Sequence, residues 1–151
     1  MKAVVQRVRN ASVTVDGKVT GSIDHGLLVY LGVARGDDER DVEHLVRKIT
    51  RLRIFCDEAG KMNLDVGQVG GGLLVVSQFT LCADPESGNR PSFSPAADPQ
   101  TAQTLYGLFL NQAARTGLEV RCGVFGAKMH VVYENEGPVT ILYDTKNTEK
   151  T

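Results

Sequence analysis

The first third of the chain alternates between apolar and polar positions in the way that β-strands do. Side chains from Val4 to Arg9 fall in turn on opposite sides of such a strand. Two β-branched runs within Ser12–Ile23 flank Asp16 and Gly17, a pair typical of a tight hairpin. The run Gly26–Val33 is continuously apolar between glycines, which predicts a strand that is buried on both faces.

Two helical periods interrupt this β pattern. The first helix is predicted within Asp37–Leu52, with acids at its start and bases at its end, as the helix dipole favours. The second begins with Asp98 as its N-cap and Pro99 as its first residue, and Gly117 is expected at its C′ position. The apolar stripe of the first helix consists of Val42, Leu45, Val46, Ile49 and Leu52. The apolar stripe of the second consists of Ala102, Leu105, Phe109 and Ala113.

The remaining segments predict further strands and one long loop. Gly72–Leu81 has the composition of a central strand, and three more strands are expected between Leu118 and Asp144. Cys82–Pro99 is irregular and too long for an ordinary connection, which indicates a functional or partner-bound segment. The pattern predicts one α+β domain, with a β-rich, barrel-like core and two covering helices, over residues 1–145 and a tail at 146–151.

Composition changes this picture little. The chain has 151 residues, 42% hydrophobic and 23% charged, as is ordinary for a soluble single domain. The net charge of −1 argues against a protein that coats nucleic acid, although a local patch can still grip one RNA end. Five basic residues cluster near the first helix: Arg40, Arg47, Lys48, Arg51 and Arg53. A helix face exposed to solvent explains such a cluster more often than a nucleic-acid site does.

Neither secretion nor membrane insertion is expected. The N-terminal residues are charged and lack an apolar core, and no apolar run approaches the roughly 18 residues of a membrane span. Cys56, Cys82 and Cys122 are an odd number without CxxC spacing, so they predict neither a disulfide framework nor a zinc site. A cytoplasmic location fits these features.

Standard catalytic machinery is not evident in the sequence. No GxSxG motif surrounds Ser77, and His25, His44 and His130 are not spaced as metal ligands or as parts of a triad. The glycines of Gly67–Gly72 lack the Lys-Ser/Thr of a phosphate loop and precede a strand rather than a helix. We therefore expect no metal and no cofactor.

Two short segments depart from the surrounding pattern. Ser77, Gln78 and Thr80 place polar groups at the end of an apolar strand, where they face either a cleft or simply solvent. Within Asn135–Thr140, the Gly-Pro pair predicts a break, a bulge or a tight turn in an otherwise β-like run. If its peptide bond were cis, both main-chain carbonyls would point the same way and form a rigid gate.

Taken in order, six motifs resemble the D-aminoacyl-tRNA deacylase family of the bacterial and eukaryotic type. The resemblance covers about residues 1–145. The sequence departs from the family pattern at two places: Glu136 replaces the Asp that is common there, and Thr148–Thr151 extend past the usual end. The motifs are QRVRNASVTVDG, RIFCDEAGKMNLDV, GGLLVVSQFTL, RPSFSPAADP, VFGAKMHV and NEGPVT.

The resemblance implies an enzyme that hydrolyses the ester between a D-amino acid and the terminal adenosine of tRNA. It also implies a homodimer with its active sites at the subunit interface. Gly137 and Pro138, joined by a cis bond, would enter the partner's pocket, exclude L side chains and hold the amine of the substrate. Glycine, without a side chain, would pass this gate. Arg7 would hydrogen-bond near the pair, although it is equally interpretable as an ordinary exposed strand residue.

The resemblance also assigns the pocket. Main-chain N–H groups of the Ser77–Thr80 segment would stabilise the oxyanion, and the 2′-hydroxyl of the terminal ribose would help to activate water. Thr80 as nucleophile is the less favoured alternative, because no base stands near it. Four of the implied pocket residues belong to this strand end: Ser77, Gln78, Phe79 and Thr80. Ala102 would line the amino-acid end of the pocket. Phe125 and Met129 would contact the adenine, although packing in the core is the other explanation for these two.

Two other functions remain open from the sequence. One is a nucleic-acid-binding dimer without catalysis, using the basic cluster. The other is a general esterase that uses Ser77 or Thr80 with His130 and needs no 2′-hydroxyl.

Overall fold

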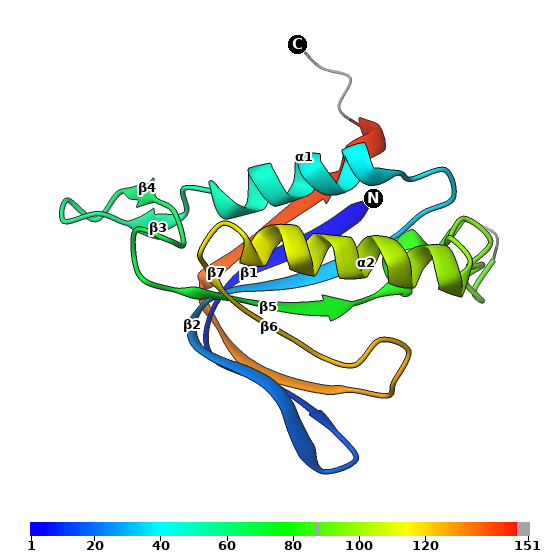
Figure 1. The fold of residues 1–151 in the computed structure, drawn as a ribbon, viewed down its shortest axis with the longest axis horizontal. Helices are drawn as coiled ribbons and strands as arrows, with labels where there is room; N and C mark the ends of the chain where they lie inside the picture. Colours follow the sequence, from blue (N-terminus) through cyan, green and yellow to red (C-terminus); the bar gives the residue numbers. More distant parts are fainter. Residues whose placement is uncertain (87, 148–151) are drawn as a thin grey trace.

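The computed structural model of the chain describes residues 1–86 and 88–147. Its centre is a hairpin of two long antiparallel strands, β1 (Lys2–Val15) and β2 (Lys18–Gly32). Asp16 and Gly17 form the turn, both with positive φ (48° and 76°), which confirms the predicted hairpin. In Figure 1 the turn projects away from the helices, at the lower edge of the molecule.

The hairpin is extended on both sides into a mixed sheet. β5 (Gly72–Ser77) pairs in parallel with β2, and β6 (Glu119–Cys122) pairs in parallel with β5. β7 (His130–Asp144) pairs antiparallel with β1 on the other side, so the order in the described residues is β6-β5-β2-β1-β7. The apolar runs predicted as central strands are indeed the inner members of this sheet.

Both helices lie side by side on one face of the sheet (Figure 1). α1 (Glu39–Thr50) starts with a capping box, in which the Asp38 side chain accepts from the backbone and Asp41 accepts from the Asp38 amide. α2 (Pro99–Ala114) starts as predicted, with Asp98 accepting a hydrogen bond from the Thr101 amide. Gly117 (φ 87°) is at C″ and not at C′ as predicted, because the C-cap is Arg115.

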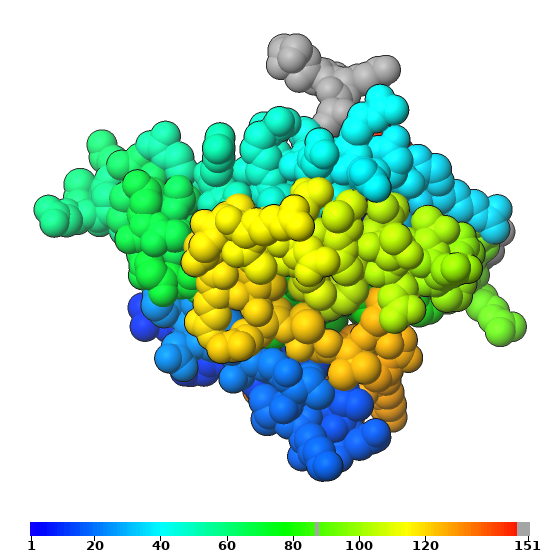
Figure 2. All heavy atoms as spheres, viewed as in Figure 1, coloured from blue at the N-terminus to red at the C-terminus, as the bar shows by residue number. Residues whose placement is uncertain are grey.

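The core has two parts, one on each face of the sheet. The larger part fills the space between the sheet and the two helices, and includes Val5, Leu27, Val29, Leu45 and Phe109. The smaller lies on the opposite face, where no helix covers the sheet, and consists of Val8, Ala11, Val13, Ile23, Leu28, Leu74 and Val76. Figure 2 shows the helices covering the upper half of the molecule and the β1–β2 hairpin extending below them.

The sheet is bent but open, so the barrel-like core is not confirmed. Closure would require β6 to pair with β7, and the described residues contain no such ladder. β6 has four residues against fifteen in β7, too short an edge to close the sheet. The α+β class and the two covering helices are confirmed.

Shorter elements complete the chain. β3 (Phe55–Cys56) and β4 (Met62–Leu64) form a small hairpin beyond the end of α1. A 3-10 turn, η1 (Phe79–Cys82), follows β5, and a second, η2 (Thr145–Asn147), follows β7. Of the predicted tail, Lys146 lies with its Nζ 3.1 Å from Asp41 Oδ2 of α1. Residues 148–151, which were expected to extend past the usual end of the family that the sequence resembles, lie outside the described residues.

No helix in the described part of the chain is long and apolar enough to cross a membrane.

Candidate active site

The chain leaves the sheet abruptly after Ser77. The neighbouring strand β2 ends at Gly32, so the last β5 residue pairs with Leu31 and the Gln78 amide donates to the Leu31 carbonyl over 2.8 Å. The strand predicted to reach Leu81 therefore stops four residues earlier and continues as η1. A Cβ at Gly32 would lie 2.8 Å from the Gln78 carbonyl oxygen, so this close approach requires glycine.

Two amide groups are left without a main-chain acceptor at this turn. Phe79 and Thr80 open the 3-10 turn, where no preceding turn supplies a carbonyl. Neither amide donates to another backbone group of the described residues outside the regular elements. The exit from β5 thus presents neighbouring N–H donors next to the Ser77 and Gln78 side chains.

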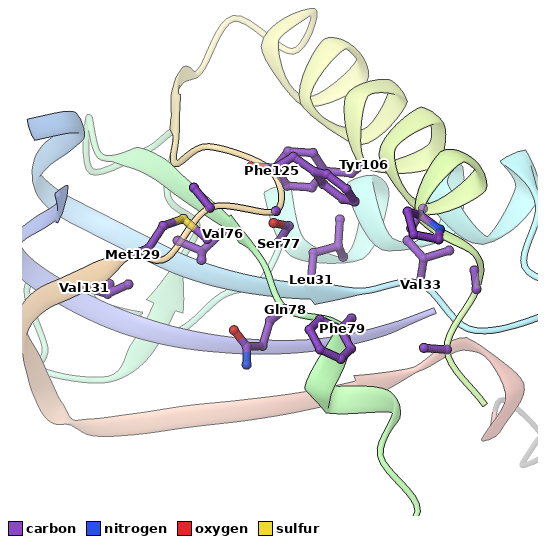
Figure 3. Close-up of a pocket in the computed structure, with 16 residues that line it drawn as sticks. Leu31, Val33, Val76, Ser77, Gln78, Phe79, Tyr106, Phe125, Met129 and Val131 are labelled. Atoms are coloured by element: carbon purple, nitrogen blue, oxygen red, sulfur yellow. The ribbon is translucent and has the colours of Figure 1, made fainter. Parts of the chain in front are cut away.

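A cavity of about 440 Å³ lies beside this turn, between the sheet, α2 and the loop that leads into β7. Figure 3 shows Met129 and Val131 towards one end, Val33 at the other, and Ser77 between them. The cavity brings together six of the residues predicted for the site, which come from two separate motifs and from α2: Ser77, Gln78, Phe79, Ala102, Phe125 and Met129.

Phe125 is held against the cavity by α2. Its ring centroid lies 5.8 Å from that of Tyr106, and the Tyr106 hydroxyl donates to the Val75 carbonyl over 3.0 Å. Burial raises the pKa of Tyr106, so its hydroxyl stays neutral. Tyr106 was missed from the sequence, although it lies four residues after Ala102 and hence on the same helix face.

Met129 reaches the cavity because of a glycine on the same loop. A Cβ at Gly123 would lie 2.5 Å from the Met129 sulfur, so any other residue there would displace the thioether. A thioether and an aromatic ring on this side of the cavity suit a flat, weakly polar ligand.

Thr80 is the predicted pocket residue that does not line the cavity. Its hydroxyl instead accepts a hydrogen bond from the Gln78 side-chain amide. No histidine of the described residues lines the cavity, and His130 is exposed on β7. Among the described residues, Ser77 therefore has no imidazole base beside it in the cavity.

The Gly-Pro segment forms a bulge in β7 rather than the end of a strand. Thr140 pairs with Gln6 and Asn135 pairs with Val8, so four β7 residues lie opposite Arg7 alone. β7 is an edge strand, where a proline costs no ladder hydrogen bond on its open side. The Gly137–Pro138 bond is cis, and both residues are exposed.

Arg7 supports this bulge from inside the protein. Its Nε donates to the Glu136 carbonyl over 3.2 Å, and its Nη1 donates to the Ile54 carbonyl over 2.6 Å. The Asn135 amide nitrogen donates to the carbonyls of Arg7 and Val139 over 3.1 Å and 3.0 Å. Arg7 is only 9% exposed, so its interpretation as an ordinary exposed strand residue is wrong.

The single chain does not bring the bulge to the cavity. Arg7, Gly137 and Pro138 are not among the cavity-lining residues, and they belong to the β1–β7 side of the sheet. The described residues also contain no cluster of histidine, cysteine and acidic side chains that could hold a metal ion. The chemistry available at the cavity is that of main-chain amides, Ser77 and Gln78.

Comparison with known proteins assigns this arrangement to a family. The family model described as D-Tyr-tRNA(Tyr) deacylase matches residues 4–144. The D-aminoacyl-tRNA deacylase of Aeromonas hydrophila is 56% identical over 140 residues, covering 93% of this chain and 97% of that protein. The D-aminoacyl-tRNA deacylase of Aquifex aeolicus is 53% identical over 146 residues, covering 97% and 99%.

A solved structure described as c-Myc DNA unwinding element binding protein superposes on this fold with a TM-score of 0.90. It shares 44% sequence identity and covers 96% of this chain and 99% of that one. The family match and the curated relatives span nearly the whole chain, and the chain therefore belongs to the D-Tyr-tRNA(Tyr) deacylase family.

Proposed function

We propose that this protein hydrolyses the ester that joins a D-amino acid to the terminal adenosine of tRNA, in the cytoplasm, with residues 1–145 carrying the activity. The observation that carries the proposal is the cavity beside Ser77 and Phe79, which gathers residues of three family motifs around one space. Its relatives' names supply the substrate class, and the cavity supplies a place for it.

The substrate is oriented by the character of the cavity walls. We assign the adenine to the end with Phe125 and Met129, where stacking on a ring and a thioether favours a flat base. The ester then falls beside Ser77 and Phe79, and the amino acid points towards Ala102. Ala102 is small and buried, so this end has room for the groups around Cα.

Catalysis in this proposal depends on position and hydrogen bonding more than on an enzyme base. The amides of Phe79 and Thr80 have no main-chain acceptor among the described residues outside the regular elements, and in this proposal they stabilise the oxyanion as water attacks the carbonyl. The 2′-hydroxyl of the ribose helps to activate that water, and the bond to the 3′-oxygen breaks as the 3′-oxygen takes up a proton.

Chiral selection is assigned to a second copy of the chain. Because Gly137 and Pro138 are exposed and lie away from the cavity of their own chain, we propose a homodimer in which the partner's bulge enters the pocket. Its main-chain carbonyls would occupy the space that an L side chain needs, and rejection by clash works for every side chain alike. Glycine esters would escape rejection because they have no side chain to clash.

The direct test compares D-Tyr-tRNA with L-Tyr-tRNA. We expect release of tyrosine from the D ester alone, and no release from D-Tyr-tRNA that ends in 2′-deoxyadenosine. Cleavage of the deoxy substrate at the normal rate would contradict the role of the 2′-hydroxyl and favour the general esterase. An inert D ester would favour a non-catalytic nucleic-acid-binding dimer, an alternative suggested by the name of the DNA-element-binding relative.

A further inference from the structure

The bulge of β7 is bordered by two residues that still pair with β1. Asn135 is the last paired residue before it and Thr140 is the first after it, so Glu136–Val139 have only Arg7 opposite them. A bulge of this size leaves main-chain groups of the facing strand without their ladder partners. The side chains that supply those missing partners therefore decide the shape of the bulge.

Both hydrogens of the Asn135 side-chain amide are used, one on each strand. Nδ2 donates to the Arg7 carbonyl of β1 over 3.1 Å and to the Val139 carbonyl at the end of the bulge over 3.0 Å. The amide thus gives the Arg7 carbonyl a donor where the ladder has no β7 partner for Arg7. An asparagine side chain has two donor hydrogens, and here each of them has an acceptor.

The other side of the same amide fixes its orientation. Oδ1 of Asn135 accepts from the Gln6 side-chain amide over 3.4 Å, and that amide also donates to the Thr140 hydroxyl over 3.0 Å. If the Asn135 amide were turned over, its oxygen would face two carbonyls and its nitrogen would face the NH₂ group of Gln6. One orientation alone satisfies all of these partners.

Asn135 and Arg7 hold the two ends of the bulge. Arg7 donates to the carbonyl of Glu136, the first bulged residue, and Asn135 donates to that of Val139, the last. In the described part of the chain, neither side chain donates to the carbonyls of the Gly-Pro pair between them, and this pair is exposed. The two inner carbonyls are therefore left for contacts outside the chain, in a direction that depends on how the ends are held.

Resting on the proposed function, we propose that Asn135 is a positioning residue of the chiral gate. It does not line the cavity of its own chain, but by holding the Val139 end it sets where the inner carbonyls lie in the partner's pocket. A displacement of about 1 Å in such a group is enough to change a rate about a hundredfold. Rejection by clash requires carbonyls that fill the space of an L side chain. Loss of the Asn135 donors therefore weakens the rejection of L esters more than it weakens the cleavage of D esters.

The test measures kcat/KM for L-Tyr-tRNA and D-Tyr-tRNA with the full-length protein, at enzyme concentrations that make slow cleavage of the L ester measurable. Asn135→Asp keeps the size of the side chain but places an oxygen against both carbonyls, so the L-to-D ratio is expected to rise at least about tenfold. Asn135→Ala removes the donors without adding a charge and should raise the ratio as well. Asn111→Asp makes the same change at an exposed position of α2 outside the cavity lining, and should leave the ratio unchanged.

A purely structural role of Asn135 predicts a different result, because it would lower both rates together. An unchanged ratio in both Asn135 variants, with thermal unfolding showing an intact fold, would overturn the positioning role while leaving the hydrolase in place. If Asn135→Asp does not fold, Asn135→Ala decides between the two outcomes. If the unsubstituted protein does not cleave D-Tyr-tRNA, the proposed function fails, and the positioning role fails with it.

Discussion

Gly137 shows how much depends on a single residue of the bulge. Its φ is +129°, and a Cβ there would lie 2.7 Å from Val139 Cγ2 and 3.0 Å from the Val139 nitrogen. A side chain is therefore excluded both by backbone conformation and by space. The bulge can hold its shape only with glycine at this position.

We predict that Gly137→Ala lowers kcat/KM for D-Tyr-tRNA at least about tenfold, because the displaced bulge would no longer fit the partner's pocket that we propose it enters. Gly60→Ala is the control, since Gly60 also has positive φ (74°) but nothing within 4 Å of a Cβ. Gly60→Ala should lose roughly 1 kcal/mol of stability from the backbone, and Gly137→Ala should lose more because its Cβ also clashes with Val139. Full activity of Gly137→Ala in a deacylation assay would refute the gate.

A second substitution tests whether the Thr80 hydroxyl takes part in catalysis. Its hydroxyl contacts the Gln78 side chain and lies outside the cavity lining, so Thr80→Ala should keep kcat/KM within about threefold of the unsubstituted protein. Thr104→Ala removes a comparable exposed hydroxyl from α2 and gives the reference. A loss of about a thousandfold in Thr80→Ala alone would instead identify a nucleophile.

At the scale of elements, the start of α1 is connected to the C-terminal η2 turn by the charged contacts of Asp41. Burial by itself raises the pKa of Asp41, but hydrogen bonds from the Thr145 hydroxyl, the Asp38 amide and Lys146 outweigh it and lower the pKa to about 2. Asp41 thus joins the helix N-terminus to η2 at the far end of the chain.

This junction predicts an acid-sensitive part of the stability. The pKa of Asp41 is 3.8 without these contacts, so its contribution is fully present above about pH 4 and is lost as the pH falls towards 2. Asp41→Asn should lower the free energy of unfolding at pH 7 by up to about 2 kcal/mol. Urea unfolding measured between pH 7 and 2.5 checks this, with the exposed Glu43→Gln as control. Identical pH slopes for Asp41→Asn and the unsubstituted protein would contradict it.

The elements themselves follow closely from sequence periodicity. The hairpin at Asp16 and Gly17, the N-cap at Asp98 and the stripes of both helices were predicted, except that Leu52 lies beyond the end of α1, because each depends on residues close in the chain. The strand end at Ser77 was not, since it is set by where the neighbouring β2 stops. The barrel-like closure failed for the same reason: it depends on pairing between strands distant in sequence.

The candidate site was predictable only in part. Resemblance supplied six residues that the fold brings to one cavity, but Tyr106 needed the helix face to be known. Burial of Arg7 could have been suspected, because the strand period places it on the same side as Val5. A charged residue on a core-facing side gains partners only once Ile54 and Glu136 are folded beside it.

At the scale of the whole molecule, the bulge and the cavity of one chain lie apart, so the proposed mechanism needs two chains at each site. We predict complementation between a variant with a blocked cavity, Ala102→Phe, and one with a damaged bulge, Gly137→Ala. In a mixed dimer one site combines the intact cavity with the intact bulge, so an equal mixture should regain about a quarter of the normal sites. Co-purification through two different tags and a deacylation assay measure it.

Two controls are needed to interpret the complementation experiment. Each variant alone should keep at most about a tenth of the normal activity, and sedimentation should show a dimer in both. If mixed dimers form and no activity returns, cavity and bulge do not meet across an interface.

The guanidinium of Arg7 binds the carbonyls of Glu136 and Ile54, and this attachment affects how the bulge meets an incoming substrate. Because the loop is tethered from the interior, its shape is complete before any ligand arrives, and little freedom is lost when a complex forms. In the proposed gate, a surface fastened in this manner would discriminate at the first encounter instead of adjusting to whichever enantiomer it meets.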